Sequence, residues 1–240
     1  MNISIVIHYS KDRKFQLENT IACLGDMDGI QDTEKILLVD GETNIKPAGW
    51  KVVEIPRRSE HYEPSYIWNT GFKFASNEMV LTLESDRILP KYWLPVAIEQ
   101  LKTHDFVCNK KLYQLKYLCG LEALRIIRDY PDEYYKHKKA IIEDFRVNHP
   151  DKGIAKKNPM SGCLLCTKEA FNSIGGFDER YLQAGYHDLD AFRTAYIMGK
   201  RICALNCIEL HQKHDYIGGW EQFREVNMEN KARYYEKWKL

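Results

Sequence analysis

The sequence predicts an α/β protein built on a mostly parallel β-sheet flanked by helices. Short apolar runs, rich in β-branched residues and of the length of buried strands, occur at residues 3–9, 34–42, 50–56 and 78–83. Several are followed by a longer segment whose apolar residues recur at helical spacing. Strands that alternate with helices form βαβ units with right-handed connections, and such units build a parallel sheet.

The first half of the chain alternates in this way. The strand ISIVIHY at 3–9 is followed by RKFQLENTIACL at 13–24, where the apolar side chains have near-helical spacing. The strands EKILLVDGE and WKVVEIP then precede SYIWNTGFKFAS at 65–76, a helical pattern that leads into the strand EMVLTL. Each helical segment is long enough to cross over one face of the sheet.

The second half is less regular. A helix is expected at 92–102 and a strand at 104–109, the α/β pattern resumes with MSGCLLCTKEAF, and RICALNCIEL alternates like a strand. The last residues, 220–240, lack proline and glycine and predict a terminal helix. Residues 111–158 are rich in Lys, Tyr, Asp and Glu and include the amphipathic run LCGLEALRIIRDY, so we expect a helical insertion there.

Composition limits the function classes. The chain has 240 residues, a net charge of +1 and 29% charged residues, so overall charge does not favour a nucleic-acid partner. No apolar run approaches the roughly 20 residues needed to span a bilayer. The N-terminus lacks a basic region and a cleavage signal, and seven scattered cysteines fit a reducing compartment. We therefore expect a cytoplasmic protein without a transmembrane segment.

Two carboxylates end the strand EMVLTL. Glu84 and Asp86 are separated by one serine, and in extended chain such residues point to the same side. Carboxylate oxygens are ligands for Mg²⁺ and Mn²⁺, and ligands of open α/β sheets bind beyond the carboxyl ends of strands. The alternative is a strand that surfaces into a solvated turn.

Other candidates follow later strands and loops. Asp40 ends a predicted strand, where it could accept a hydrogen bond from a base or ribose or simply form a turn with Gly41. Asp188 and Asp190 begin a helical run and could serve chemistry or cap the helix. Aromatic residues that could stack on a base or sugar occur in the same loops, namely Tyr9, Tyr66, Trp68, Tyr186 and Trp220.

Two histidines three residues apart, His211 and His214, follow the strand RICALNCIEL and could bind a metal. Together with Cys203 and Cys207 they also suggest zinc. The spacing is not that of a zinc finger, however, and the alternation of the segment favours a strand.

The blocks SIVIHYSKDR, LLVDGE, SYIWNTGFKFASNEMVLTLESDRILP, MSGCLLCTKEAFNSIGGFDERYLQAGYHDLDAFRTAYIMG and LHQKH occur in the order found in GT-A type nucleotide-sugar glycosyltransferases. The chain resembles the inverting family-two enzymes and the β-1,4-galactosyltransferase and chondroitin-polymerase groups. The resemblance covers residues 3–109 and 159–215 in blocks. It implies a Rossmann-like GT-A fold, a UDP-sugar as the expected donor, a glycan or other hydroxyl acceptor, and Mn²⁺ or Mg²⁺ as cofactor.

The resemblance also implies roles for individual residues. Glu84 and Asp86 match the Asp-x-Asp motif, with Asp86 as the direct metal ligand, and Asp188 matches the catalytic base. His211 or His214 matches a metal-ligand histidine. Contacts to the nucleotide-sugar are further expected from Tyr9, Asp40 and Asn69, and contacts to the acceptor from Tyr186, His187, Asp190 and Trp220.

Three positions depart from the family pattern. The first motif acid is Glu84 instead of Asp, and its longer side chain could contact ribose or metal-bound water in place of the metal. His8 stands where proline is usual, and His187 stands where Glu is usual before the base.

We therefore expect a single GT-A domain at 1–240. Its parts are a nucleotide-sugar-binding part (1–109), the helical insertion (111–158), an acceptor and catalytic part (159–219) and a C-terminal helix (220–240). The expected activity is inverting, metal-dependent sugar transfer. A sugar nucleotidyltransferase would be expected to have a glycine-rich basic loop after the first strand. The segment HYSKDRKF at that position contains no glycine, so this alternative is disfavoured. The other alternative is an inactive sugar-binding module on the same fold.

Overall fold

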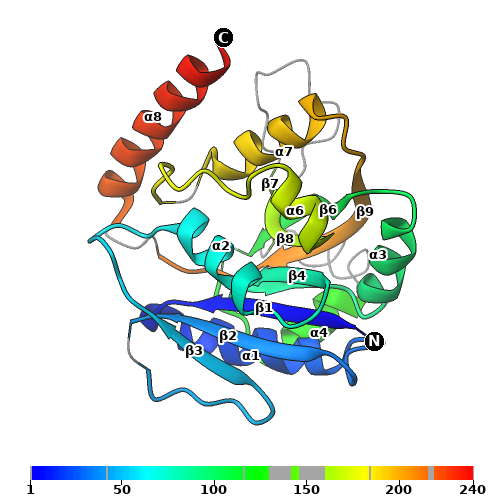
Figure 1. Ribbon diagram of the computed structural model, residues 1–240. Helices are drawn as coiled ribbons and strands as arrows, with labels where there is room; N and C mark the ends of the chain where they lie inside the picture. Colours follow the sequence, from blue (N-terminus) through cyan, green and yellow to red (C-terminus); the bar gives the residue numbers. More distant parts are fainter. Residues whose placement is uncertain are drawn as a thin grey trace.

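One β-sheet forms the centre of the protein in the computed structural model (Figure 1). The structure describes residues 2–41, 43–115, 117–129, 142–145, 160–183, 185–215 and 219–239. Within these ranges the sheet has nine strands. They are β1 (Ile3–Tyr9), β2 (Glu34–Asp40), β3 (Lys51–Ile55), β4 (Met79–Glu84), β5 (Arg87–Ile88), β6 (Phe106–Leu115), β7 (Ile142–Phe145), β8 (Met160–Thr167) and β9 (Ile202–His211).

The strand order is β3-β2-β1-β4-β8-β6-β9-β5, with β7 paired to β6. Strands β3, β2, β1 and β4 are mutually parallel, and β6 and β9 are parallel to each other. Because β8 is antiparallel to both β4 and β6, strands β6 and β9 run in the same direction as β4. The carboxyl ends of β1, β2, β4, β6 and β9 therefore meet at one edge. The predicted α/β class, with a sheet flanked by helices, is confirmed.

Helices cover both faces of the sheet. On one face α1 and α3 bury Leu17, Leu24 and Trp93 in a cluster with side chains of β1, β6 and β8, and on the other α2, α6 and α7 bury Phe72, Phe171 and Phe192. The long α8 lies at the outside of the molecule (Figure 1). The helices are α1 (Lys14–Gly25), α2 (Pro64–Phe74), α3 (Trp93–Leu101), α4 (Leu121–Asp129), α6 (Lys168–Ser173), α7 (His187–Ile197) and α8 (Gly219–Trp238).

The alternation of strand residues decides which side chains can share a site. In β1, Ile5 and Ile7 pack toward α1, whereas Val6 packs toward α2. His8 has the same parity as Val6, so it lies on the α2 face. All of β1 is buried, which explains why its sequence is apolar almost throughout.

The stretch expected as a helical insertion, residues 111–158, is not wholly helical. Residues up to Leu115 extend β6, and β7 adds a further antiparallel strand beside it. Helix α4 accounts for the amphipathic run, because Leu124 and Ile127 pack against Cys23. The sequence did not predict the strand at 111–115, because pairing with β7 and β9 outweighs local propensity there. The rest of the stretch lies outside the described residues.

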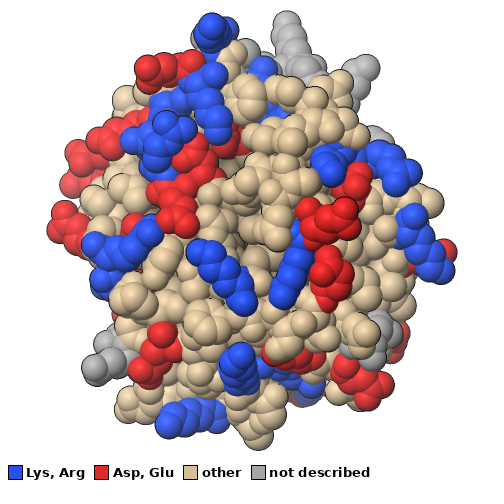
Figure 2. All heavy atoms as spheres, viewed as in Figure 1, with Lys and Arg blue, Asp and Glu red and all other residues tan. Residues whose placement is uncertain are grey.

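The charge on the surface is mixed. Basic and acidic side chains alternate over the face shown in Figure 2, and neither sign dominates it. Among the described helices, none combines the length and the apolar character that crossing a membrane requires.

Candidate metal and nucleotide site

Polar side chains gather at the carboxyl edge of the sheet. Asp40 is the last residue of β2, and Glu84 is the last of β4 and lies opposite His8 of β1. Strand β9 ends at the same edge with His211. The acid triplet and the histidine segment, far apart in the sequence, are therefore neighbours at the edge where the sequence predicted a ligand.

The two-residue strand β5 holds the acid triplet next to the histidine segment. Strand β5 follows the triplet and pairs antiparallel with β9, which places Arg87 opposite His211. The backbone N–H of Gln212 donates to the carbonyl oxygen of Asp86 at 2.9 Å, and the Thr20 hydroxyl donates to the carbonyl oxygen of Ser85 at 2.8 Å. The backbone around Asp86 is thus held from both β9 and α1.

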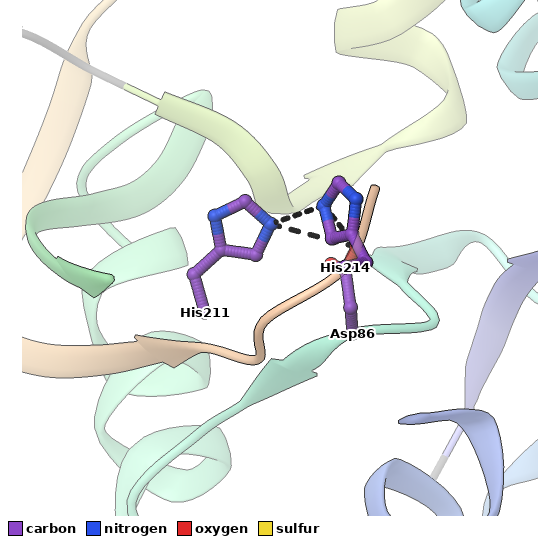
Figure 3. A group of neighbouring side chains, drawn as sticks. All are labelled: Asp86, His211 and His214. Carbon is purple, nitrogen blue, oxygen red and sulfur yellow. Dashed lines mark hydrogen bonds and ion pairs between the residues drawn. The ribbon is translucent and has the colours of Figure 1, made fainter. Parts of the chain in front are cut away.

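The side chains of Asp86, His211 and His214 converge on one point (Figure 3). Oδ2 of Asp86 lies 3.1 Å from Nε2 of His214 and 3.5 Å from Nε2 of His211, and the two Nε2 atoms are 2.9 Å apart. Asp86 is fully buried. Its other oxygen, Oδ1, is buried without a hydrogen-bond partner among the described residues.

The electrostatics favour a carboxylate beside two neutral imidazoles. Burial alone would raise the pKa of Asp86, but His211 when it is protonated, and the guanidinium groups of Arg13 and Arg87, outweigh burial and hold that pKa well below its usual range. Burial lowers the pKa of His214 to about 4 and also lowers that of His211. Nδ1 of His214 lies 2.8 Å from the carbonyl oxygen of Asp215, so its proton belongs there and Nε2 keeps a lone pair.

This donor set fits a divalent cation. One ligand atom from each of the three residues lies within 4.8 Å of the others. One carboxylate and two imidazoles, the latter neutral, are ligands of divalent transition metals. Cys203 and Cys207 are not part of the group, and the Cys207 thiol instead contacts Oδ1 of Asn109 at 3.0 Å. The alternation of that strand in the sequence indicated the same.

Two arginines complete the site, and the sequence argument missed both. Arg13, in the 3₁₀ turn after β1, donates from Nη1 to Oδ2 of Asp86 at 2.6 Å. Arg87 donates from Nε to Oε2 of Glu84 at 2.7 Å. The sequence positions of the two arginines could have indicated this role, since Arg87 directly follows the triplet and Arg13 follows the first strand at the same predicted edge. Single arginines, however, give no periodic pattern.

The nucleotide-side candidates have different environments. Asp40 is 8% exposed, and its Oδ2 accepts hydrogen bonds from Nε and Nη2 of Arg57, both at 3.1 Å. Tyr9 is 3% exposed and belongs to the core beneath α1. His8 is 5% exposed, stacks on Tyr62 at 5.1 Å, and has its pKa lowered to about 3 by burial. Of these, Asp40 and His8 lie on the α2 face of the sheet, and His8 is opposite Glu84.

Asn69 of α2 holds a loop. Its amide oxygen accepts from the Phe177 N–H at 2.9 Å, and its amide nitrogen donates to the Phe177 carbonyl oxygen at 2.9 Å. Gly176 has a φ of 73°, and a Cβ there would lie 2.8 Å from the Asn69 amide oxygen. Glycine is therefore required at position 176 for this contact, which the sequence could not show.

Helix α7 carries the candidate base. Asp188 lies half-buried in its first turn, and Oδ1 accepts from the Leu189 N–H at 2.9 Å. The preceding Tyr186 has a left-handed φ of 66° and packs against Tyr234 of α8 at 5.5 Å. His187 is buried, 5.8 Å from the Phe177 ring.

Two residues that were expected to bind the sugar acceptor, Asp190 and Trp220, contact α8 or belong to it. Asp190 does not cap α7; it accepts from Nε1 of Trp238 at 2.8 Å and from Nζ of Lys237 at 2.7 Å. Trp220, at the start of α8, is 60% exposed and stacks on Phe223. Asp190 thus links α7 to α8, whereas Trp220 lies at the surface.

Solved structures of similar fold include a mannosyltransferase and TarS. A mannosyltransferase from Pyrobaculum calidifontis, in complex with GDP-Man and Mn²⁺, superimposes with a TM-score of 0.62 at 13% identity over 98% of this chain and 63% of its own. S. aureus TarS 1–349, in complex with UDP-GlcNAc, gives 0.61 at 16% identity over 94% of this chain and 64% of its own. A longer structure of TarS gives 0.60 at 18% identity over 94% and 38%.

The chain spans less than two thirds of each of these structures. No protein-family profile and no curated protein matches the sequence. The likeness is therefore one of fold, and the chain has a GT-A-like α/β fold.

Proposed function

We propose that the protein is a metal-dependent, inverting glycosyltransferase. It moves a sugar from a nucleotide-diphosphate sugar, which we take to be a UDP-sugar, to a hydroxyl group of a glycan or another acceptor. The observation that carries the proposal is the convergence of Asp86, His211 and His214 at the carboxyl edge of the sheet. Two of the neighbours with this fold were solved with a nucleotide-sugar, and one of these also with Mn²⁺.

We propose Mn²⁺ in preference to Mg²⁺. Mg²⁺ prefers an octahedral shell of oxygen atoms, whereas imidazole nitrogen suits transition metals. Two of the three protein ligands here are imidazoles. The cation, when bound, neutralises charge that builds on the departing diphosphate.

The chain's own residues bind and orient the donor. In this proposal Asp40, at the end of β2, accepts a hydrogen bond from the base or ribose in place of the one from Arg57. Arg13 brings a fixed positive charge to the Asp86 carboxylate, where the diphosphate is to be held. A guanidinium is a good partner for phosphate oxygens because its donors form a planar fork.

Asp188 acts as the general base in this proposal. Its carboxylate takes the proton of the acceptor hydroxyl while that oxygen forms a bond to the anomeric carbon and the bond to the diphosphate breaks. One displacement of this kind inverts the configuration. Help from a general base contributes about 10²–10⁴ in rate, and orientation and leaving-group stabilisation supply the rest.

The test is Asp86→Ala. The parent protein is expected to release nucleotide from a UDP-sugar only with Mn²⁺, to lose this activity in EDTA, and to regain it when Mn²⁺ is restored. Asp86→Ala should bind neither Mn²⁺ nor UDP at micromolar metal, whereas the matched control Asp12→Ala, in the turn after β1, should behave like the parent.

Full turnover in EDTA would refute the metal centre. Binding of a UDP-sugar with no hydrolysis or transfer to any acceptor in a broad screen would instead support the sugar-binding module.

A further inference from the structure

A buried arginine connects the acid triplet to β9. The Arg87 side chain is only 11% exposed, and its guanidinium faces three carboxylates. Nη2 lies 2.6 Å from Oε2 of Glu84, Nε lies 3.4 Å from Oδ1 of Asp86, and Nη1 lies 3.3 Å from Oε1 of Glu209. A single cation thus contacts both acids of the triplet at once.

The space for this guanidinium is built into the sheet. A Cβ at Gly162 of β8 would lie 2.8 Å from Cζ of Arg87 and 2.9 Å from Oε1 of Glu209. Glu209 is fully buried, and its other oxygen accepts from Nδ2 of Asn109 at 2.9 Å. Nε1 of Trp93 in turn donates to Oδ1 of Asn109 at 2.5 Å. The guanidinium is therefore held between the acid triplet, Glu209 and the backbone of Gly162.

The carboxylate oxygens of Glu84 and Asp86 have different partners. Both Nε and Nη2 of Arg87 contact the same oxygen of Glu84, Oε2. Oδ1 of Asp86 faces Arg87, while Oδ2 faces the two histidines. Among the described residues, the group that could hold a metal includes Asp86 and leaves Glu84 out.

We propose that Arg87 is a positioning residue that keeps Glu84 out of the metal shell and turns Oδ2 of Asp86 toward the histidines. This inference rests on the proposed function, because it concerns the metal centre of that same reaction. Its consequence is metal selectivity. With Glu84 held, one carboxylate and two imidazoles remain, a set that favours Mn²⁺; with Glu84 released, an added oxygen ligand makes the site more acceptable to Mg²⁺.

The first test measures binding of Mn²⁺ and Mg²⁺ to the purified protein by titration calorimetry. Glu84→Gln retains an acceptor oxygen for Arg87 and removes the negative charge of Glu84. We expect its Mn²⁺ affinity to stay within about threefold of the parent, as for the control Glu99→Gln on the exposed side of α3. A disturbed metal ligand would instead cost about 10–100-fold, and such a loss would overturn the proposal.

The second test removes the arginine. Arg87→Met should lower the ratio of the Mg²⁺ to the Mn²⁺ dissociation constant by about 10-fold, because Glu84 becomes available as a ligand. The double variant Arg87→Met/Glu84→Gln should restore the parent ratio. An arginine with only a structural role would weaken both ions alike and leave the ratio unchanged, which would refute the assignment. If Arg87→Met does not fold, Glu84→Gln alone decides.

The two proposals fail in different ways. If the parent binds no Mn²⁺, the metal centre itself is wrong and this inference falls with it. If the parent binds Mn²⁺ and Glu84→Gln loses it, only the role of Arg87 is refuted and Glu84 is a ligand.

Discussion

His214 and Asp86 are held as a pair at the carboxyl edge of the sheet. Nε2 of His214 lies 3.1 Å from Oδ2 of Asp86, while Nδ1 is directed at the Asp215 carbonyl oxygen. His211 lies slightly farther, with Nε2 at 3.5 Å from the same oxygen. The ring of His214 is thus fixed by a second contact of the kind that metal-bound histidines make.

The first prediction follows from this pair. His214→Ala should reduce Mn²⁺ affinity by about 10-fold or more, the order found for a disturbed metal site, and His211→Ala should do the same. Titration with Mn²⁺ measures it. His104→Ala is the matched control, because His104 precedes β6 and so lies toward the opposite edge of the sheet. Parent-like Mn²⁺ binding by both site variants would make the segment LHQKH structural.

The second prediction separates chemistry from binding at Asp188. Asp188→Asn keeps the hydrogen bond from the Leu189 N–H, which is 2.9 Å in the parent, but cannot accept a proton. Transfer should fall by about 10²–10⁴ while affinity for the UDP-sugar changes little, the pattern of an interaction used in the transition state. Because Asn caps a helix as well as Asp does, a capping role predicts turnover within about threefold of the parent, and that result would exclude Asp188 as the base.

The third prediction concerns acid stability. Burial lowers the pKa of His8 from 6.5 to about 3, so the unfolded chain binds a proton more readily than the folded protein does. The stability due to neutral His8 is complete above pH 6.5 and is lost as the pH falls toward 3. Between pH 7 and pH 4 this amounts to about 3 kcal/mol, at 1.4 kcal/mol per unit of pH.

His8→Gln removes that titration. In urea denaturation at pH 7 and pH 4 the parent should therefore lose about 3 kcal/mol more than His8→Gln does. His214, whose pKa is lowered to about 4, titrates in both proteins and cancels in the comparison. Equal losses in the two proteins would show that His8 is not held neutral by burial.

The fourth prediction assigns Asp190 to structure. Asp190→Ala leaves Nε1 of Trp238 without its acceptor and removes one of the two carboxylates that Lys237 contacts, the other being Asp178, so we expect a loss of about 1–3 kcal/mol in unfolding free energy. Asp190→Asn keeps an acceptor for Trp238 and should cost less. Urea denaturation gives the stabilities, and limited proteolysis within α8 shows whether this helix is released. An Asp190→Ala variant as stable as the parent would return Asp190 to the candidates for acceptor binding.

The sequence by itself determined the framework of the protein. The apolar run of β1 and the helical spacing in α1 are local patterns, and each is set by burial on one or both faces of its element. The same patterns predicted that Asp40 and Glu84 each end a strand of the parallel sheet. Strand direction alone then places them at one edge of the sheet, so the location of the candidate site was predictable.

Only the tertiary structure decided how the polar side chains are paired. The two-residue strand β5 is too short to give a pattern, yet its pairing with β9 brings Asp86 to the histidines. The contacts of Arg87 with Glu209 and of Asp190 with α8 likewise join residues remote in the chain. A buried charge must find a partner wherever the packing provides one, and that choice depends on the whole fold.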